Sequence, residues 1–213
     1  MTLAGILFDK DGTFVDFDAT WGEGTHAVMT LLSAGDAGRF ERLGAALHYD
    51  APRRRFHPTS PLIAGAPDDY LHLWATILER PNDHAFLADM NRHFADATLR
   101  ALTPIGAPGA VMEALHRRGL KLGLATNDSE ASGRAQVMAL GLDAHMDFLA
   151  GYDTGHGAKP GPGMVLAFAA SLGVPPGRIA MVGDSLHDMQ AARVAGAVAV
   201  AVLTGPATRT MLE

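Results

Sequence analysis

Apolar positions in the second half of the chain form short, continuous runs that alternate with segments of helical character. Four such runs cover residues 120–125, 148–152, 179–182 and 198–202, and a fifth covers residues 3–8. Continuous hydrophobicity, rather than strict alternation, is typical of strands that are buried on both faces. The helical segments between the runs stop at residues suited to capping a helix, namely Gly119, Gly141, Gly173 and Gly196. The pattern predicts an α/β fold with a doubly wound parallel sheet.

Residues 17–100 interrupt this alternation with helical patterns alone. We expect helices near residues 19–33, 36–48, 68–79 and 83–99, and no strand among them. Residues 51–61 contain three prolines and are therefore not expected to be helical throughout. The sequence predicts a core formed by residues 1–16 and 101–213, with a helical subdomain inserted between the two parts.

Polar residues follow several of the predicted strands directly. Asp9 and Asp11 come after the run at residues 3–8, and Asp184 comes after the run at residues 179–182. Ligands of a doubly wound sheet bind beyond the carboxyl ends of its strands. Two carboxylates at the end of a buried strand are costly unless a cation or hydrogen bonds offset their desolvation. A bound Mg²⁺ ion would compensate both carboxylates. The alternative is an ordinary polar turn, since Asp and Gly are common in turns.

Composition narrows the class of protein further. The 213 residues are 48% hydrophobic and 19% charged, as in globular proteins, and the net charge of −6 argues against a general nucleic-acid surface. The sequence contains no cysteine, which excludes disulfides and thiol chemistry. No apolar run approaches the length that spans a bilayer. We expect a cytoplasmic protein without nucleic-acid or membrane partners, either a monomer or a homodimer.

Four segments taken together resemble the ordered motifs of the haloacid dehalogenase superfamily. They are Asp9-Lys10-Asp11-Gly12-Thr13, Ala125-Thr126-Asn127, Ala158-Lys159-Pro160 and Gly183-Asp184-Ser185-Leu186-His187-Asp188. Each segment follows its own predicted strand, and the match spans nearly the whole chain. The resemblance implies a Rossmann-like core of this superfamily and a phosphate-ester hydrolase, because an acid two residues after the nucleophile is absent from dehalogenases and phosphonate-cleaving members.

The resemblance also implies roles for individual residues. Asp9 would be the nucleophile that forms an aspartyl-phosphate, and Asp11 the general acid and base. Mg²⁺ would be held by Asp9, by Asp184 and by the backbone carbonyl of Asp11. Several residues would surround the phosphoryl group: Thr126, Asn127 and Lys159 would bind it, Thr13 would assist nearby, and Asp188 would orient Lys159 or a metal-bound water.

The helical insert resembles the cap of the branch that includes phosphoglycolate phosphatase and β-phosphoglucomutase. A cap closes over the substrate and reads its leaving group. The densest cationic cluster of the chain lies in this insert and is a candidate for binding a second anionic group of the substrate; it consists of Arg53, Arg54, Arg55 and His57. Phe17 and Trp21, by contrast, are expected to pack within the insert. The alternative for the cationic cluster is a solvated loop.

Other interpretations stay open at this point. A phosphomutase shares the same core, and a non-catalytic protein that binds phosphometabolites would keep the fold. Gly183-Asp184-Ser185-Leu186 also spells the signature of GDSL esterases, but no histidine follows His187 to complete a triad. The sequence does not identify the leaving group. The chain ends soon after residue 202, earlier than expected for this branch, so we expect either that a last edge element of the sheet is missing or that the sequence is truncated at its C-terminus.

Overall fold

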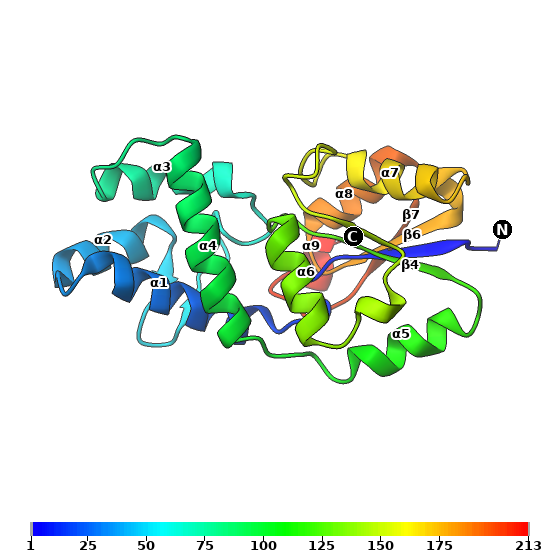
Figure 1. The fold of residues 1–213 in the computed structure, drawn as a ribbon, viewed down its shortest axis with the longest axis horizontal. Coiled ribbons are helices and arrows are strands. Elements are labelled where there is room, and N and C mark those ends of the chain that lie inside the picture. The colour runs from blue at the N-terminus through cyan, green and yellow to red at the C-terminus, as the bar shows by residue number, and fades with distance from the viewer. Residues whose placement is uncertain (1, 213) are drawn as a thin grey trace. The chain divides into compact units, whose positions relative to one another are not determined.

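The computed structural model describes residues 2–212 and contains a parallel five-stranded sheet in the order β5-β4-β1-β6-β7 (Figure 1). The central strand β1 (Gly5–Phe8) pairs with β4 (Lys121–Ala125) and with β6 (Ile179–Gly183). The outer strands are β5 (Phe148–Ala150) and β7 (Val198–Ala201). This arrangement confirms the predicted doubly wound parallel α/β fold.

Helices follow the strands on both faces of this sheet. Helices α5 (Pro108–His116) and α6 (Glu130–Ala139) cover one face, and α7 (Gly163–Ser171) and α8 (Leu186–Ala195) cover the other (Figure 1). The short helices η2 (Asp143–His145), η3 (Pro176–Arg178) and α9 (Arg209–Leu212) complete this part of the chain. The four glycines predicted to stop helices all have positive φ, as a left-handed cap requires.

The hydrophobic core of the sheet lies mainly between its strands and helices α7 and α8. Leu7, Met181 and Phe168 are fully buried there. The prediction that every strand is buried on both faces was wrong for β7, in which Val198 and Val200 are 43% and 38% exposed. β7 is an edge strand with only β6 beside it, so its side chains are less covered than those of the central strands.

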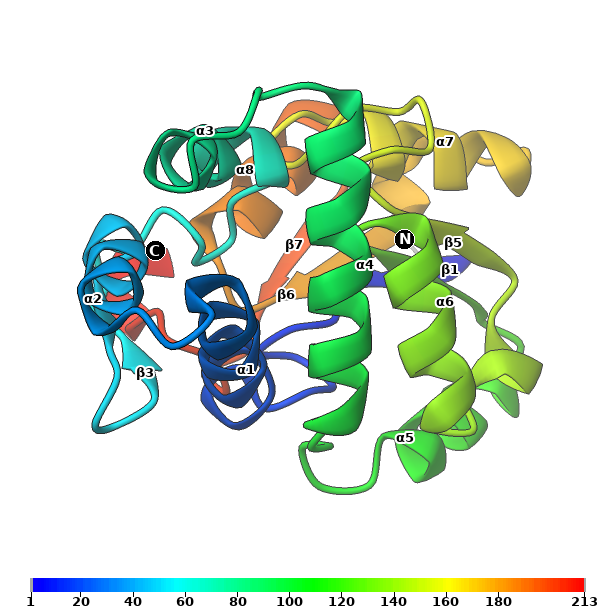
Figure 2. The ribbon, with the colours of Figure 1, turned by 60° about the vertical axis from the view of Figure 1, so that its left-hand side comes forward.

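The contacts within the chain define two compact units. A core unit runs up to Asp16 and resumes at Pro104, and a helical unit comprises Phe17–Thr103. In the helical unit a π-helical turn, η1 (Asp18–Gly22), leads into α1 (Glu23–Ser33), and α2 (Ala37–Ala46), α3 (Pro67–Ile77) and α4 (His84–Arg100) follow. Figures 1 and 2 show α1 and α4 side by side.

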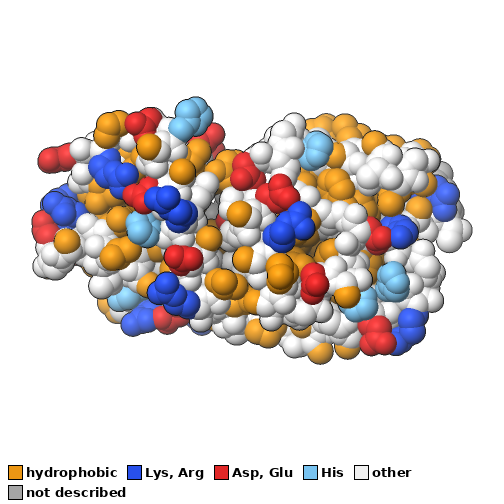
Figure 3. All heavy atoms as spheres, in the orientation of Figure 1, with side chains coloured by type: hydrophobic (Ala, Val, Ile, Leu, Met, Phe, Trp, Pro, Cys, Tyr) orange, Lys and Arg blue, Asp and Glu red, His pale blue; other side chains and the backbone are white. Residues whose placement is uncertain are grey.

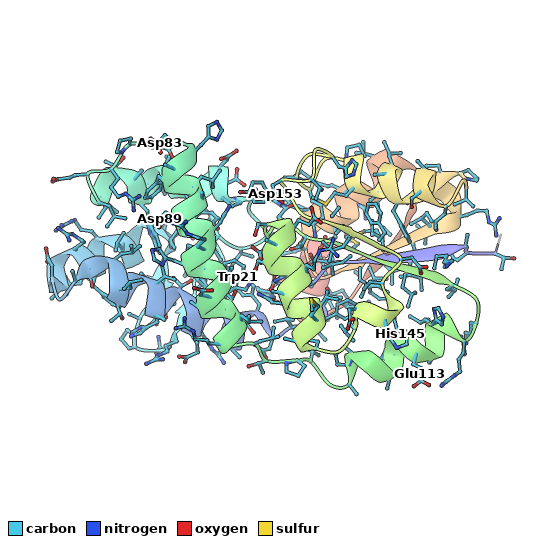
Figure 4. All side chains as sticks on the ribbon, in the orientation of Figure 1. Trp21, Asp83, Asp89, Glu113, His145 and Asp153 are labelled. Carbon is cyan, nitrogen blue, oxygen red and sulfur yellow. The ribbon has the colours of Figure 1, made fainter. Side chains whose placement is uncertain are left out.

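The helical unit also contains a small antiparallel pair, β2 (Tyr49–Asp50) with β3 (Arg55–Phe56). The expectation that this segment has no strand was therefore wrong. The pair is two residues long on each side and is closed by a turn in which Arg54 has a φ of +54°, so the sequence carries almost no strand periodicity. Phe17 and Trp21 pack in the aromatic core of this unit, as predicted, and Trp21 is labelled in Figure 4.

Among residues 2–212, no helix has both the length and the apolar character needed to cross a membrane.

Candidate active site

Asp9 lies at the carboxyl end of the central strand β1. Its backbone N–H donates to the carbonyl oxygen of Val182 at 2.8 Å, so the pairing between β1 and β6 continues up to Asp9. The residue is 7% exposed. The sheet therefore fixes this carboxylate in a largely desolvated position. Ligands of this fold bind beyond the carboxyl ends of the strands, which is where Asp9 lies.

Asp184 follows β6 and is enclosed by two glycines. A Cβ atom at Gly12 or at Gly205 would overlap the carboxylate of Asp184. Gly12 also has a φ of +80°, which few other residues adopt. The loop after β1 and the loop after β7 can therefore approach Asp184 closely only because both positions are glycine.

Lys159 connects Asp9 with Asp188. Its Nζ donates to Asp9 Oδ1 at 2.6 Å and to Asp188 Oδ1 at 2.7 Å, and the residue is 5% exposed. The side chain of Asn127 holds the Lys159 backbone: Asn127 Nδ2 donates to the Lys159 carbonyl, and the Lys159 N–H donates to Asn127 Oδ1, both at 2.8 Å. The peptide bond between Lys159 and Pro160 is cis. Lys159 is thus held at its backbone and at its ammonium group.

Asp188 is fully buried at the start of α8, and both of its carboxylate oxygens are engaged. Oδ1 accepts from Lys159, and Oδ2 accepts from the backbone N–H and the hydroxyl of Ser185 at 3.0 and 2.6 Å. Ser185 in turn accepts from the Asp188 N–H, which completes a capping box. These contacts place Asp188 where it orients Lys159.

Three buried carboxylates meet at this edge of the sheet. Asp9, Asp184 and Asp188 each offer an oxygen, and these oxygens all lie within 4.8 Å of one another. When all three are ionised, three negative charges face the single ammonium of Lys159, so two negative charges have no counter-charge within the cluster. Hard oxygen donors of this kind are the ligands that divalent cations such as Mg²⁺ prefer, and the residues present therefore fit a divalent metal ion.

The surroundings of these carboxylates disfavour their ionised forms. Burial raises the pKa of Asp9 to about 7; Lys159 opposes this rise, whereas Asp188 and Asp11 add to it. Burial and the charges of Asp9 and Asp188 raise the pKa of Asp184 to about 8. For Lys159, burial lowers the pKa, but the two carboxylates it contacts outweigh burial and raise it. Binding of a divalent cation to the cluster would offset the cost of ionising these buried carboxylates.

These pKa shifts predict a dependence of stability on pH. The folded-state pKa values of Asp9 and Asp184 lie above the unfolded value of 3.8, so their contribution to stability is complete below about pH 4 and is lost as pH rises through about 7 to 8. In a chelator, we expect the free energy of unfolding to fall by on the order of 3 kcal/mol between pH 6 and pH 8. Denaturant titration measures this change.

The matched control for this prediction is the double variant Asp9→Asn with Asp184→Asn, in which the fall should be much smaller. Saturating Mg²⁺ should also reduce the fall in the parent, because the ion compensates the ionised carboxylates. An identical slope in the parent and in the double variant would assign the pH dependence to other groups.

The other predicted site residues lie around this cluster. Lys10 Nζ contacts both carboxylate oxygens of Asp11, at 2.8 and 2.7 Å. Thr126 is 1% exposed, and its hydroxyl accepts from the N–H of Asp128 at 3.1 Å. The Thr13 hydroxyl is buried and has no hydrogen-bond partner within the part of the chain that the structure describes. Both ends of the Asn127 side-chain amide contact the Lys159 backbone, and the phosphate-binding role expected for Asn127 stays a prediction.

Sequence reasoning missed a second buried lysine network beside the cluster. Lys10 is 1% exposed and reaches Gln136 on α6 as well as Asp128. A signal for it exists in the sequence: Lys10 sits between two aspartates at the end of a buried strand, where an ammonium group requires buried partners. The partners themselves lie more than a hundred residues away, and no local pattern identifies them.

The cationic cluster of the helical unit is engaged in ion pairs. Arg53 pairs with Asp50 at 2.9 Å, Arg54 with Glu23, and Arg55 with Asp18 at 3.5 Å. His57 is exposed, and its Nδ1 lies 2.9 Å from the Thr59 hydroxyl. Figure 3 shows cationic and acidic side chains interspersed over this unit. A role of these residues in contacting substrate stays a prediction.

Comparisons with known proteins agree with this geometry. The family model described as haloacid dehalogenase-like hydrolase matches residues 3–196. Phosphoglycolate phosphatase from Rhodospirillum rubrum is 38% identical over 202 residues, which cover 94% of this chain and 79% of that protein. Phosphoglycolate phosphatase from Chromobacterium violaceum is 32% identical over 216 residues and covers 99% of this chain and 89% of its own length.

Solved structures show the same fold. An HAD family hydrolase from Deinococcus radiodurans, crystallised with bound phosphate and sodium, superposes with a TM-score of 0.60 at 21% identity, covering 92% of this chain and 79% of that one. The chain therefore belongs to the haloacid dehalogenase-like hydrolases, as its four motifs predict. It is an enzyme of the phosphatase class.

Proposed function

We propose that this protein is a Mg²⁺-dependent cytoplasmic phosphatase that hydrolyses a small phosphorylated metabolite through an aspartyl-phosphate on Asp9. One observation carries the proposal: Asp9 is buried at the end of the central strand, in contact with Lys159, and shares a three-carboxylate cluster with Asp184 and Asp188. A carboxylate placed in this way can attack a phosphoryl group, provided that the charge it brings is compensated.

The first step transfers the phosphoryl group to the enzyme. An oxygen of Asp9 attacks phosphorus, the bond between phosphorus and the ester oxygen breaks, and Asp11 donates its proton to the leaving oxygen to give an alcohol. Lys159, already in contact with Asp9, counters the negative charge on the phosphoryl oxygens. Asp9 and Asp184 would hold the Mg²⁺ ion, with the carbonyl of Asp11, and bound there it would offset the repulsion between two anions.

The second step releases phosphate and restores the enzyme. Asp11, now a carboxylate, takes a proton from water, and the resulting hydroxide oxygen attacks phosphorus as the bond to Asp9 breaks. Asp188 keeps Lys159 beside Asp9 throughout. Because Asp11 gains in this step the proton that it lost in the first, the cycle closes without any further acid or base.

The relatives point to the substrate class. Two proteins that are more than 30% identical over most of this chain carry the name phosphoglycolate phosphatase, so a short phosphorylated hydroxy acid is the substrate that we propose first. A carboxylate on such a substrate requires a cationic partner in the enzyme. We propose the cationic cluster of the helical unit for this role: Arg53, Arg54, Arg55 and His57.

A hydrolysis screen tests the proposed function. The protein is incubated with Mg²⁺ and phosphoglycolate, several sugar phosphates and nucleoside monophosphates, and released phosphate is measured. We expect phosphate from at least one of them and the highest kcat/KM for phosphoglycolate. Interconversion of sugar phosphate isomers without release of phosphate would show a phosphomutase instead, and no turnover of any ester would favour a binding protein.

A further inference from the structure

A second ammonium group is buried beside the site and has no role in the chemistry proposed so far. Lys10 stands between Asp9 and Asp11 in the sequence. Its Nζ contacts both carboxylate oxygens of Asp11, at 2.8 and 2.7 Å. The residue is 1% exposed. Lys10 is therefore committed to the carboxylate of Asp11.

The Lys10 ammonium also contacts a residue on helix α6 and a residue in the loop before that helix. Lys10 Nζ donates to Gln136 Oε1 at 2.9 Å and lies 3.3 Å from Asp128 Oδ2. Asp128 is itself fixed, since it accepts from the Ser132 hydroxyl at 2.6 Å and from the Ser129 N–H at 2.8 Å. The ammonium thus links Asp11, in the loop after β1, to Gln136 on α6 and to Asp128 in the loop before that helix.

Charge balance supports the same assignment. Two carboxylates face the Lys10 ammonium, Asp11 at 2.7 Å and Asp128 at 3.3 Å. Asp11 and Asp128 would repel each other if Lys10 were absent, because both carboxylates lie within reach of one nitrogen atom. Lys10 consequently holds the carboxylates of Asp11 and Asp128 close together and restricts the orientation of the Asp11 side chain.

We infer that Lys10 is a positioning residue that holds Asp11, anchored through Gln136 and Asp128, at the place from which it transfers a proton to the leaving oxygen. This inference rests on the proposed function. General acid catalysis contributes about 10²- to 10⁴-fold, and small displacements of a catalytic group cost about 10²-fold, so the effect is measurable.

The leaving group distinguishes this role from a merely structural one. An alkoxide leaving group, as in phosphoglycolate, departs slowly without a proton, whereas para-nitrophenolate departs readily without one. A variant in which Asp11 is misplaced should lose activity on the alkyl ester far more than on the aryl ester. A variant that only destabilises the fold should lose activity on both esters in the same proportion.

The experiment compares Lys10→Met with the parent on phosphoglycolate and on para-nitrophenyl phosphate, with kcat/KM as the readout because it reports on the first, leaving-group-dependent step. We expect kcat/KM to fall by about 100-fold or more for the alkyl ester and by less than about 10-fold for the aryl ester. Lys121→Met is the matched control, since it removes an exposed lysine that pairs with Asp147; both values should stay near those of the parent.

Two further variants keep the test decisive if Lys10→Met folds poorly. Lys10→Met combined with Asp128→Asn removes one buried charge of each sign, and Gln136→Leu keeps every charge while it removes an anchor of the ammonium. Both should show the same preferential loss on the alkyl ester, smaller in Gln136→Leu. Equal losses on both esters in all three variants would overturn the inference. If the parent hydrolyses neither of these esters nor any other ester of the hydrolysis screen, the proposed function itself fails.

Discussion

Asp9→Asn should abolish turnover while leaving the protein at least as stable as the parent. The amide cannot form an acyl phosphate, so we expect kcat to fall by about 10⁴-fold or more, as for other nucleophile replacements. Burial raises the pKa of Asp9 to about 7, which means that its ionised form is unfavourable in the folded protein at pH 8. Removal of this charge should therefore raise the thermal midpoint in a chelator at that pH. Phosphate release and thermal unfolding measure the two effects.

A matched control makes the first prediction specific. Asp143→Asn applies the same chemical change at an exposed position in η2 and should alter neither activity nor stability by a measurable amount. Asp9→Asn should also bind Mg²⁺ more weakly than the parent, because the cluster loses one of its charged oxygens. Retention of more than a few per cent of parental turnover in Asp9→Asn would exclude Asp9 as the nucleophile.

Lys159→Met should produce the second largest effect, and here activity and stability should fall together. Lys159 is the ammonium that contacts both Asp9 and Asp188. Its removal leaves buried carboxylates without their partner, a change that typically costs about 3–5 kcal/mol of stability. It also removes the charge that faces the phosphoryl oxygens, for which we expect kcat to fall by about 10³-fold. Denaturant unfolding and steady-state kinetics below the unfolding transition measure both losses.

The stability loss in Lys159→Met should be smaller in the presence of Mg²⁺ than in a chelator. The ion compensates part of the charge that Lys159 leaves behind, so saturating Mg²⁺ should restore more stability to Lys159→Met than it adds to the parent. Lys121→Met, which breaks an exposed ion pair, should cost less than about 1 kcal/mol under either condition. Normal kcat in a folded Lys159→Met variant would contradict the role proposed for this residue.

The core of the fold could be read from the sequence because strong, local patterns specify it. Buried parallel strands produce continuous apolar runs, and the glycines that end the helices have the positive φ that a cap requires. The small pair of strands at Tyr49–Asp50 and Arg55–Phe56 was missed because two residues on each side produce no periodicity. The exposure of β7 was missed because an apolar run does not reveal whether a strand lies at the centre or at the edge of a sheet.

In the candidate site, too, residues within short motifs could be predicted from the sequence, whereas contacts between distant residues could not. Asp9, Asp184 and Lys159 could be named from the sequence because each follows its own strand within a short motif, and parallel strands bring their carboxyl ends together. Gln136 lies within a helix whose sequence pattern indicates only that one face is buried. That pattern does not predict the contact between Gln136 and Lys10. Contacts of this kind depend on the packing of α6 against the sheet, which the sequence pattern does not encode.

Chemical trapping of the phosphorylated enzyme shows whether Asp9 is the nucleophile. The protein is mixed with substrate and Mg²⁺, quenched during turnover and treated with borohydride, which reduces an acyl phosphate to an alcohol. Tandem mass spectrometry then locates the reduced residue. We expect that Asp9, and no other carboxylate, is converted to homoserine, and that the conversion requires both substrate and Mg²⁺. Reduction at another aspartate, or full turnover with no trapped acyl phosphate at Asp9, would contradict it.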